Sequence, residues 1–359
     1  MSLNLNKKIL ILIPALNPEP ELETYVEKLK KENFENILII DDGSERKYQK
    51  TFQHLEENGC HILRHEKNQG KGKAIKNGLK FLLNLDDSSD YVGVVTVDCD
   101  GQHLVKDIIN VAKTMEKKTN SLVLGSRDFT KDNVPHKSSF GNKMTSKIFK
   151  ILYGVTITDT QTGLRGIPLS LAQELSTLAG DRYEYETNML IDCIVKKINI
   201  EEVPIETIYI DNNSGTHFRP IRDSVLIYGR ILNSFIKYSV VSLLSTFVDL
   251  LLFQILVSFL KIGVKETTLI LVSTILARLV SSLMNFYLNK NVSFKSSKDI
   301  SETIFKYYFL CIVQMIVSGL CVSGIFCVTR LPKVAIKIVV DTILFIVNFR
   351  IQKNYIFEK

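Results

Sequence analysis

Two aspartates separated by one residue end an apolar run in the stretch "VTVDCDGQH", residues 95–103. At the end of a buried strand the carboxylates of Asp98 and Asp100 would repel each other, and burial alone would disfavour their charged forms. A divalent cation bound to a diphosphate supplies the compensation, because Mg²⁺ and Mn²⁺ prefer carboxylate and phosphate oxygens. A pair with this spacing also occurs by chance, so the prediction depends on the residues that accompany it.

Polar residues follow the other apolar runs in the same way. The short β-branched runs cover residues 8–14, 36–44, 61–65, 91–98 and 121–127, and helical patterns such as 21–32 and 72–85 separate them. Strands that alternate with helices predict an α/β domain with a mostly parallel sheet. Ligands bind such sheets beyond the carboxyl ends of the strands. We therefore expect a site from the residues that follow the runs, namely Pro14, Leu16, Glu19, Asp41, Asp42, Asp98, Asp100 and Gln102.

The composition changes near residue 219 of the 359 residues. From about residue 238 the chain is dominated by apolar runs near the ~20 residues that cross a bilayer. Residues 219–359 carry 17 Lys and Arg against 7 Asp and Glu, whereas residues 1–218 carry 28 against 31. A basic membrane half and a slightly acidic soluble half favour anionic lipid headgroups, and not nucleic acid, as the partner of the basic surface.

Cysteine usage and the N-terminal residues exclude other classes of protein. The six cysteines form no C-x-x-C pair and no Cys/His ligand spacing, so neither disulfides nor structural zinc are supported. The apolar run that follows Lys7 and Lys8 is too short for a signal sequence, and Pro14 interrupts it. We therefore expect the soluble half in the cytoplasm.

Seven motifs together resemble glycosyltransferase family 2, in its branch of dolichol-phosphate mannose synthases and bacterial polyprenyl-phosphate glucosyltransferases. They are "IPALNPE", "IIDDGS", "NQGKGKAIKNGL", "VDCDGQH", "VLGSRDF", "DTQTGLRGIP" and "EYETNML", and the resemblance covers about residues 7–235. It implies a GT-A fold, which is a Rossmann-like α/β domain, and the inverting transfer of a hexose from a nucleotide sugar to a polyprenyl phosphate. UDP-glucose is the favoured donor, and GDP-mannose also fits.

The resemblance also implies roles for individual residues. The nucleotide sugar would contact Pro14, Leu16, Glu19, Asp41, Asp42, Lys73, Asp98 and Arg127. Mg²⁺ or Mn²⁺ would be held by Asp98, Asp100 and Gln102, and the catalytic residues would be Asp159, Asp100 and Arg127. The acceptor phosphate would meet Lys143, Arg165 and His217.

The chemistry of a phosphate acceptor supports such an arrangement. A phosphate monoester is already ionised near neutral pH, so it needs less help from a base than a sugar hydroxyl does. Asp159 would therefore orient the acceptor more than deprotonate it. Cations should stabilise the departing diphosphate, although Arg127, Lys143, Arg165 and His217 could each be an ordinary surface charge instead. The "NQGKGKA" stretch lacks the spacing of a phosphate loop and predicts a tight turn before a helix, with lysines near the nucleotide.

The membrane half predicts an interfacial helix and four spans. Residues 219–237 place apolar side chains at helical spacing, as in a helix that lies in the membrane interface, and a soluble core helix is the alternative. The spans are expected at about 238–260, 267–289, 307–328 and 334–352. An even number keeps both ends on one side, and the lysines of the middle loop place that side in the cytoplasm, so we expect a multi-pass protein of the cell membrane.

An internal repeat divides the membrane half into two hairpins. "NFYLNKNVSF" (285–294) closes the second expected span, and "NFRIQKNYIF" (348–357) closes the fourth. The pattern resembles the GtrA-like four-helix family, which implies that the domain at 238–359 flips or retains the lipid-linked sugar. Charged residues inside a bilayer rarely face lipid, so we expect Arg278 to lie against Asp249, Asp341 or both.

Two other functions share parts of this pattern. A processive polysaccharide synthase has the same fold and spans but usually carries Q-x-x-R-W, and this chain has no tryptophan. A lipid flippase or membrane anchor could carry a soluble domain that only binds the nucleotide sugar, although Asp98, Asp100 and Asp159 are all present. The sequence leaves a homo-oligomer open.

Overall fold

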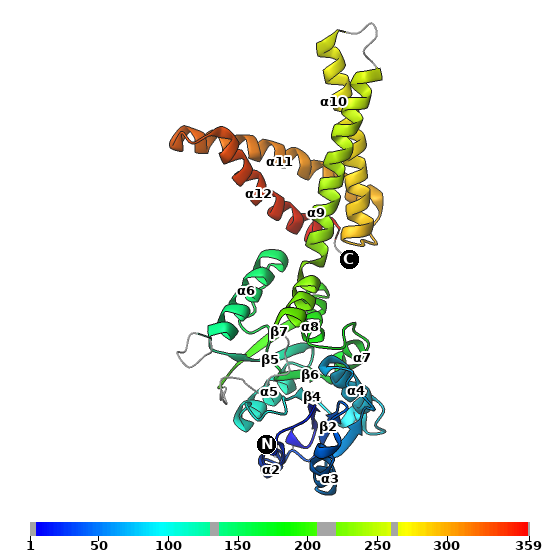
Figure 1. Cartoon of the computed structure of the whole chain (residues 1–359), viewed down its shortest axis with the longest axis vertical. Coiled ribbons are helices and arrows are strands. Elements are labelled where there is room, and N and C mark those ends of the chain that lie inside the picture. Colours follow the sequence, from blue (N-terminus) through cyan, green and yellow to red (C-terminus); the bar gives the residue numbers. More distant parts are fainter. Residues whose placement is uncertain (1–4, 130–135, 207–219, 260–264, 358–359) are drawn as a thin grey trace. The chain divides into compact units, whose positions relative to one another are not determined.

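The computed structural model describes residues 5–129, 136–206, 220–259 and 265–357, and it divides into two compact units. The first unit comprises Met1–Lys150 and Val155–Ile231, and the second comprises Ile151–Gly154 and Leu232–Lys359. The boundary between Ile231 and Leu232 lies within the segment 219–237, where the sequence predicts a helix that links the two domains. Figure 1 shows the elements of both units.

A seven-stranded sheet forms the centre of the first unit, in the order β3-β2-β1-β4-β6-β5-β7. The strands are β1 (Ile9–Ala15), β2 (Ile37–Asp41), β3 (His61–Arg64), β4 (Gly93–Thr96), β5 (Ser121–Arg127), β6 (Arg165–Pro168) and β7 (Asn199–Ile205). Neighbours pair in parallel, except that β6 is antiparallel to both β4 and β5. The expected mostly parallel α/β sheet is confirmed.

Helices cover the sheet because its strands are apolar on both faces. They are α2 (Glu21–Lys31), α3 (Gln49–Glu57), α4 (Lys71–Leu83), α5 (Val105–Lys117), α7 (Leu169–Ser176) and α8 (Glu184–Val195), whereas α6 (His136–Tyr153) lies apart from the strands (Figure 1). Ile9, Ile11 and Ile13 of β1 belong to the core that α2, α3 and α5 complete. On the opposite face of β1, Leu12 packs so closely under Gly78 of α4 that an added Cβ at Gly78 would collide with it.

The second unit contains long apolar helices. They are α9 (Pro220–Phe259), α10 (Glu266–Leu288), α11 (Ile300–Thr329) and α12 (Lys333–Ile351). Three described stretches are long and apolar enough to cross a membrane, namely Ser224–Phe259, Glu266–Ser293 and Ile300–Thr329. The expected fourth span, α12, is not among them, because it carries the charges of Lys337, Asp341 and Arg350. The expected separate interfacial helix at 219–237 is not seen either, since the described part of that segment continues without a break into α9.

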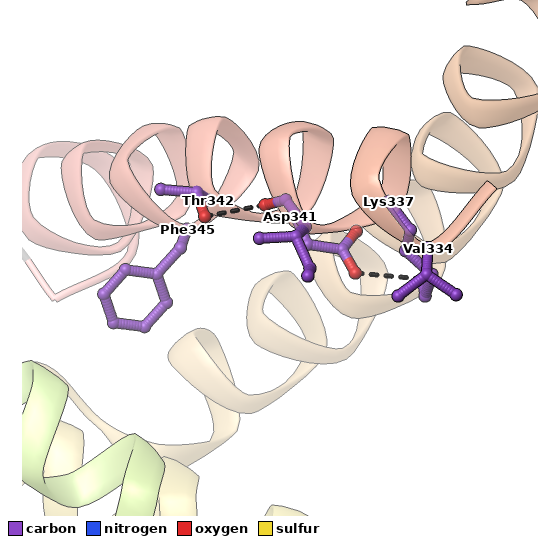
Figure 2. Close-up of a pocket in the computed structure, with 6 residues that line it drawn as sticks. Val334, Lys337, Asp341, Thr342 and Phe345 are labelled. Carbon is purple, nitrogen blue, oxygen red and sulfur yellow. Dashed lines mark hydrogen bonds and ion pairs between the residues drawn. The ribbon is translucent and has the colours of Figure 1, made fainter. Parts of the chain in front are cut away.

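The charges inside these helices pair within each hairpin. Arg278 Nη2 of α10 lies 3.3 Å from Asp249 Oδ2 of α9, as expected. Asp341 does not join them: its Oδ1 accepts a hydrogen bond from Ser318 of α11 at 2.6 Å, and its Oδ2 lies 2.9 Å from Lys337 Nζ one turn away. Figure 2 shows this pair beside a hollow of about 510 Å³, which belongs to α12 and contains none of the predicted site residues.

The sequence repeat is also a repeat of structure. Both α10 and α12 end in a short π-helix, η4 (Asn289–Ser293) and η5 (Gln352–Ile356). The contacts between the two ends are reciprocal: the rings of Phe286 and Phe357 are 5.7 Å apart, and so are those of their repeat equivalents Phe349 and Phe294. Phe294 also stacks on its own equivalent, Phe357, at 5.5 Å.

Tyrosines from the other two helices complete this aromatic cluster in the same reciprocal way. Tyr238 of α9 contacts Phe294 and Phe349, whereas Tyr307 of α11 contacts Phe357 and Phe286. Each of these four tyrosine contacts therefore has a counterpart in the other hairpin, as in a two-fold symmetric interface. The carboxyl ends of α10 and α12 consequently lie together.

The cluster should stabilise the second unit symmetrically. We expect Phe349→Leu and Phe286→Leu each to lower the free energy of unfolding by about 1–2 kcal/mol, because each removes two or more aromatic contacts of a buried ring. Phe305→Leu is the matched control, since Phe305 is 77% exposed. Thermal unfolding of the detergent-solubilised chain measures the effect, and an equal loss in all three variants would contradict the prediction.

Candidate active site

The loop after β4 brings together the three residues predicted to bind a metal. Asp100 Oδ1 accepts a hydrogen bond from the backbone N–H of Gln102 at 3.1 Å, so the loop folds back on itself. Asp98 lies at the start of the same loop, and its Oδ2 is 3.5 Å from Nε2 of the buried His103. In the described part of the chain no three His, Cys, Asp or Glu side chains converge on one point. A metal here would therefore combine the two carboxylates with the amide of Gln102 and ligands from the substrate.

The pKa values of Asp98 and Asp100 are shifted in opposite directions from their usual value. Burial alone would raise the pKa of Asp98, but the ammonium of Lys71 and a hydrogen bond with His103 hold that pKa below its usual value. The pKa of Asp100 is raised, first by its withdrawal from solvent and then by the negative charge of Asp98. Two carboxyl groups in one loop are also the hard oxygen ligands that a divalent cation prefers.

Lys71 lies at the centre of the site. Its Nζ is 2.7 Å from Asp98 Oδ1 and 2.9 Å from Glu186 Oε1 of α8. Glu186 is 6% exposed, and only 18% of the Lys71 side chain is accessible. Lys71 therefore joins the carboxyl end of β4 to α8 through two ion pairs.

Two glycines explain how Lys71 reaches this position. Gly70 precedes α4 with a φ of +103°, which favours glycine, and an added Cβ would lie 2.3 Å from the carbonyl oxygen of Asp181. An added Cβ at Gly72 would lie 2.4 Å from Cβ of Tyr185. The first turn of α4 therefore packs directly on the chain that enters α8, and the "NQGKGKA" stretch is the turn before a helix that its sequence predicts.

Asp42 fixes the turn that precedes α4. Its carboxylate accepts hydrogen bonds from the backbone N–H groups of Gln69 and Gly70, both at 2.8 Å, and lies 2.7 Å from Nδ1 of His65. Only 4% of Asp42 is exposed. Asp42 therefore positions the turn before α4, and its predicted contact with the nucleotide stays a prediction.

The loops after β1 and β2 are joined to each other. Asn17 has a φ of +49°. Its backbone N–H donates a hydrogen bond to Ser44 Oγ, and its side-chain oxygen accepts one from the backbone N–H of Glu45, both at 2.9 Å. Asp41 is buried and accepts a hydrogen bond from the N–H of Ser44, so it shapes this turn. The other predicted contacts of this region are accessible: Pro14 and Leu16 are half-buried and Glu19 is exposed.

Asp159 and Arg127 form a buried ion pair. Asp159 Oδ2 lies 2.6 Å from Arg127 Nε and Oδ1 lies 3.0 Å from Nη2, which is the bidentate geometry that arginine favours. The backbone N–H of Gln161 also donates to Asp159, which has no exposed surface. The guanidinium of Arg127 also lies over the ring of Phe129.

The remaining predicted cations are dispersed. The prediction that Arg165 meets a phosphate is wrong, because its side chain is fully buried in the central strand β6 and donates to the carbonyl oxygens of Thr162 and Glu186. Lys143 is exposed on α6, and Lys73 is half-buried in the first turn of α4. His217 lies outside the described residues.

Sequence reasoning missed two residues of this site. Lys71 lies in a motif whose lysines were expected near the nucleotide, but only Lys73 was selected. Glu186 lies in "EYETNML", where no role was assigned to it. The signal that could have found Lys71 is its position between two glycines, because Gly70 has a φ of +103° and an added Cβ at Gly72 would collide with Tyr185.

The carboxylate of Asp42 should be essential to the fold around Lys71. We expect Asp42→Ala to lower the free energy of unfolding by about 3 kcal/mol, because it leaves His65 and two backbone N–H groups without their buried acceptor. Asp86→Ala is the matched control, since Asp86 is exposed. Thermal unfolding of the full chain compares the two, and equal unfolding temperatures would contradict the positioning role.

Comparisons with known proteins agree with the geometry. Residues 10–175 match the model of glycosyl transferase family 2, and residues 232–357 match that of the GtrA/DPMS transmembrane domain. The UDP-N-acetylglucosamine–dolichyl-phosphate N-acetylglucosaminyltransferase of Methanococcus voltae is 36% identical over an alignment of 226 residues, which covers 57% of this chain and 88% of the relative. The protein MJ1222 of Methanocaldococcus jannaschii is 32% identical over 208 residues, with 57% and 83% covered.

A more distant relative is glycosyltransferase AglJ of Haloferax volcanii, which is 24% identical over 222 residues, with 61% of this chain and 69% of the relative covered. The sheet order, the carboxylate loop after β4 and these matches lead to one conclusion. The chain belongs to glycosyl transferase family 2, and it is a glycosyltransferase with a GT-A-type domain followed by a GtrA/DPMS-type transmembrane domain.

Proposed function

We propose that the chain transfers one sugar from a nucleotide sugar to a polyprenyl phosphate, with inversion at the anomeric carbon. An oxygen of the acceptor phosphate forms the bond to the anomeric carbon, and the bond to the nucleoside diphosphate breaks. The observation that carries the proposal is the loop after β4, where Asp98 and Asp100 place two carboxylates at the carboxyl edge of the sheet. The GtrA/DPMS-type domain supports a lipid acceptor.

A divalent metal fits the residues present. Asp98, Asp100 and Gln102 would hold Mg²⁺ or Mn²⁺, because the set offers hard oxygen ligands. Such an ion would neutralise charge on the departing diphosphate. The protein's own contribution is electrostatic: Arg127, fixed by Asp159, offers a preorganised guanidinium to the phosphate groups.

The donor is proposed to be a UDP-sugar. UDP-glucose is the donor favoured by the resemblance of the membrane domain, whereas the relative from Methanococcus voltae carries UDP-N-acetylglucosamine in its name. GDP-mannose is the third candidate. The chain would act at the cytoplasmic face of the cell membrane, since Lys290, Lys295 and Lys298 follow α10.

The decisive experiment identifies the lipid product. The purified full chain is incubated with undecaprenyl phosphate, Mn²⁺ and each of UDP-glucose, UDP-N-acetylglucosamine and GDP-mannose, and the lipid is analysed by mass spectrometry. We expect one sugar added per lipid with one of the donors. A longer polymer would favour a processive synthase, and no product with any donor would favour a binding or anchoring role.

Asp100 should be needed for transfer but not for folding. We expect Asp100→Ala to abolish product formation, because it removes a metal ligand, and to leave the unfolding temperature within the range of the control Asp86→Ala. Initial rates across a Mn²⁺ titration measure the effect. Near-normal rates with unchanged metal dependence would remove Asp100 from the metal site.

Asp159 and Arg127 should act as a unit. We expect Asp159→Asn and Arg127→Gln each to lower turnover about 100-fold or more, and the double variant to lose little beyond the single ones, because either change destroys the same bidentate pair. Donor affinity should change less than turnover if the pair serves the acceptor. Additive losses in the double variant would show that the two residues act separately.

A further inference from the structure

Lys71, which lies between Gly70 and Gly72 at the start of α4, provides a positive charge between two carboxylates. Lys71 Nζ contacts both Asp98 and Glu186 at ion-pair distance, and the carboxyl group of Asp100 belongs to the same loop as Asp98. An ammonium group has three donors, so it can hold both carboxylates at once. Without it, the half-buried carboxylate of Asp98 and the buried carboxylate of Glu186 would lose the cation that they share.

Both oxygens of Asp98 have close neighbours. Gly163 lies beside the whole carboxylate, since an added Cβ would be 2.2 Å from Oδ2 and 2.6 Å from Oδ1, and His103 Nε2 lies 3.5 Å from Oδ2. The other oxygen, Oδ1, is the one that Lys71 contacts. A divalent metal held by Asp98 would therefore share this carboxylate with the ammonium group of Lys71, and the two positive charges would repel each other.

We propose that Lys71 is a placeholder cation: it neutralises Asp98 in the ligand-free enzyme and releases Asp98 when the divalent metal binds, while Glu186 retains the ammonium group beside the site. This inference rests on the proposed function, because it assumes that Asp98 is a metal ligand. Lys71 is a positioning residue in this scheme. After the exchange its charge stays next to the metal site, where it faces the diphosphate of the donor.

The architecture around Lys71 supports an exchange and not a loose surface contact. Asp42 fixes the turn before α4 through the N–H groups of Gln69 and Gly70, so the backbone of Lys71 is anchored. The side chain is held at its other end by Glu186, which belongs to a different element. Only the contact with Asp98 has to break, and the ammonium keeps a partner throughout.

Binding of Mn²⁺ to the full chain, without nucleotide sugar or acceptor, tests the exchange. Free Mn²⁺ is measured by electron paramagnetic resonance, and Asp98→Ala defines the signal that belongs to this site. We expect Lys71→Met to bind Mn²⁺ about ten-fold more tightly than the wild type, because the competitor is removed. Lys71→Arg keeps the charge and should bind like the wild type, as should Lys80→Met, which makes the same change at an exposed position of α4.

A double-variant cycle separates this competition from a general effect of charge. Glu186→Gln should weaken Mn²⁺ binding in the wild type, because Lys71 then has only Asp98 as its partner. In the Lys71→Met background the same change should have a much smaller effect. Equal effects of Glu186→Gln in both backgrounds, or Mn²⁺ binding to Lys71→Met that is no tighter than to the wild type, would overturn the proposal.

Thermal unfolding gives a second readout that does not depend on activity. In EDTA, Lys71→Met should unfold at a lower temperature than the wild type, and Mn²⁺ should raise its unfolding temperature by more. A wild type that binds no Mn²⁺ at this site would overturn the exchange. Tighter binding to Lys71→Met together with no sugar transfer to any lipid would sustain the exchange and reject the proposed function, so the two failures are distinguishable.

Discussion

Repulsion between carboxylates at the carboxyl edge of the sheet is the constraint on which this site depends. Asp98 and Asp100 follow β4, and Glu186 approaches from α8. Their charges can be kept together only if cations are supplied, and in the ligand-free protein Lys71 supplies the one that bridges β4 to α8. The start of α4 places Lys71 between these carboxylates. It is fixed by the glycines on either side of Lys71 and by the buried carboxylate of Asp42.

Asp159 and Arg127 are a second pair in which a cation compensates a carboxylate, and this carboxylate has no exposed surface. Asp159 is fully buried and is compensated by the bidentate contact with Arg127. A buried pair of this kind contributes less to stability than to geometry, since the desolvation of both ions offsets most of their attraction. The pair holds the guanidinium of Arg127 in one orientation, and under the proposed function this orientation is already set before a phosphate binds.

Much of the first unit could be predicted from the sequence, because both faces of its parallel strands are buried and read as apolar runs. All five expected strands are present, and only their ends differ by a few residues. The two strands that were missed show where this signal fails. β6 (Arg165–Pro168) has four residues and begins with an arginine, whereas β7 (Asn199–Ile205) contains two glutamates and a proline. Tertiary pairing, and not local pattern, makes these segments strands.

Tertiary pairing of β6 also explains why Arg165 does not lie where a phosphate-binding residue was expected. A cation in a motif with Asp159 is a natural candidate for phosphate binding when only its type is known. Its strand lies between β4 and β5, however, so its side chain enters the interior and satisfies carbonyl groups there. Lys71 was missed for the opposite reason. The glycines beside it indicate a tight turn, but its partners Asp98 and Glu186 lie far along the chain. A local sequence pattern therefore cannot identify the ion pairs.

In the membrane unit, symmetry carries information that hydropathy does not. α12 is too charged to count as a span by composition, but Lys337 and Asp341 neutralise each other one turn apart, which lowers the cost of placing both in lipid. The reciprocal contacts of Phe286 with Phe357 and of Phe294 with Phe349 bring the carboxyl ends of α10 and α12 together. If α10 crosses the membrane, the end of α12 must therefore lie on the same side as the end of α10. Because α11 leads away from that side and is long enough to cross, α12 has to return across the bilayer, and the repeat favours four spans where composition alone gives three.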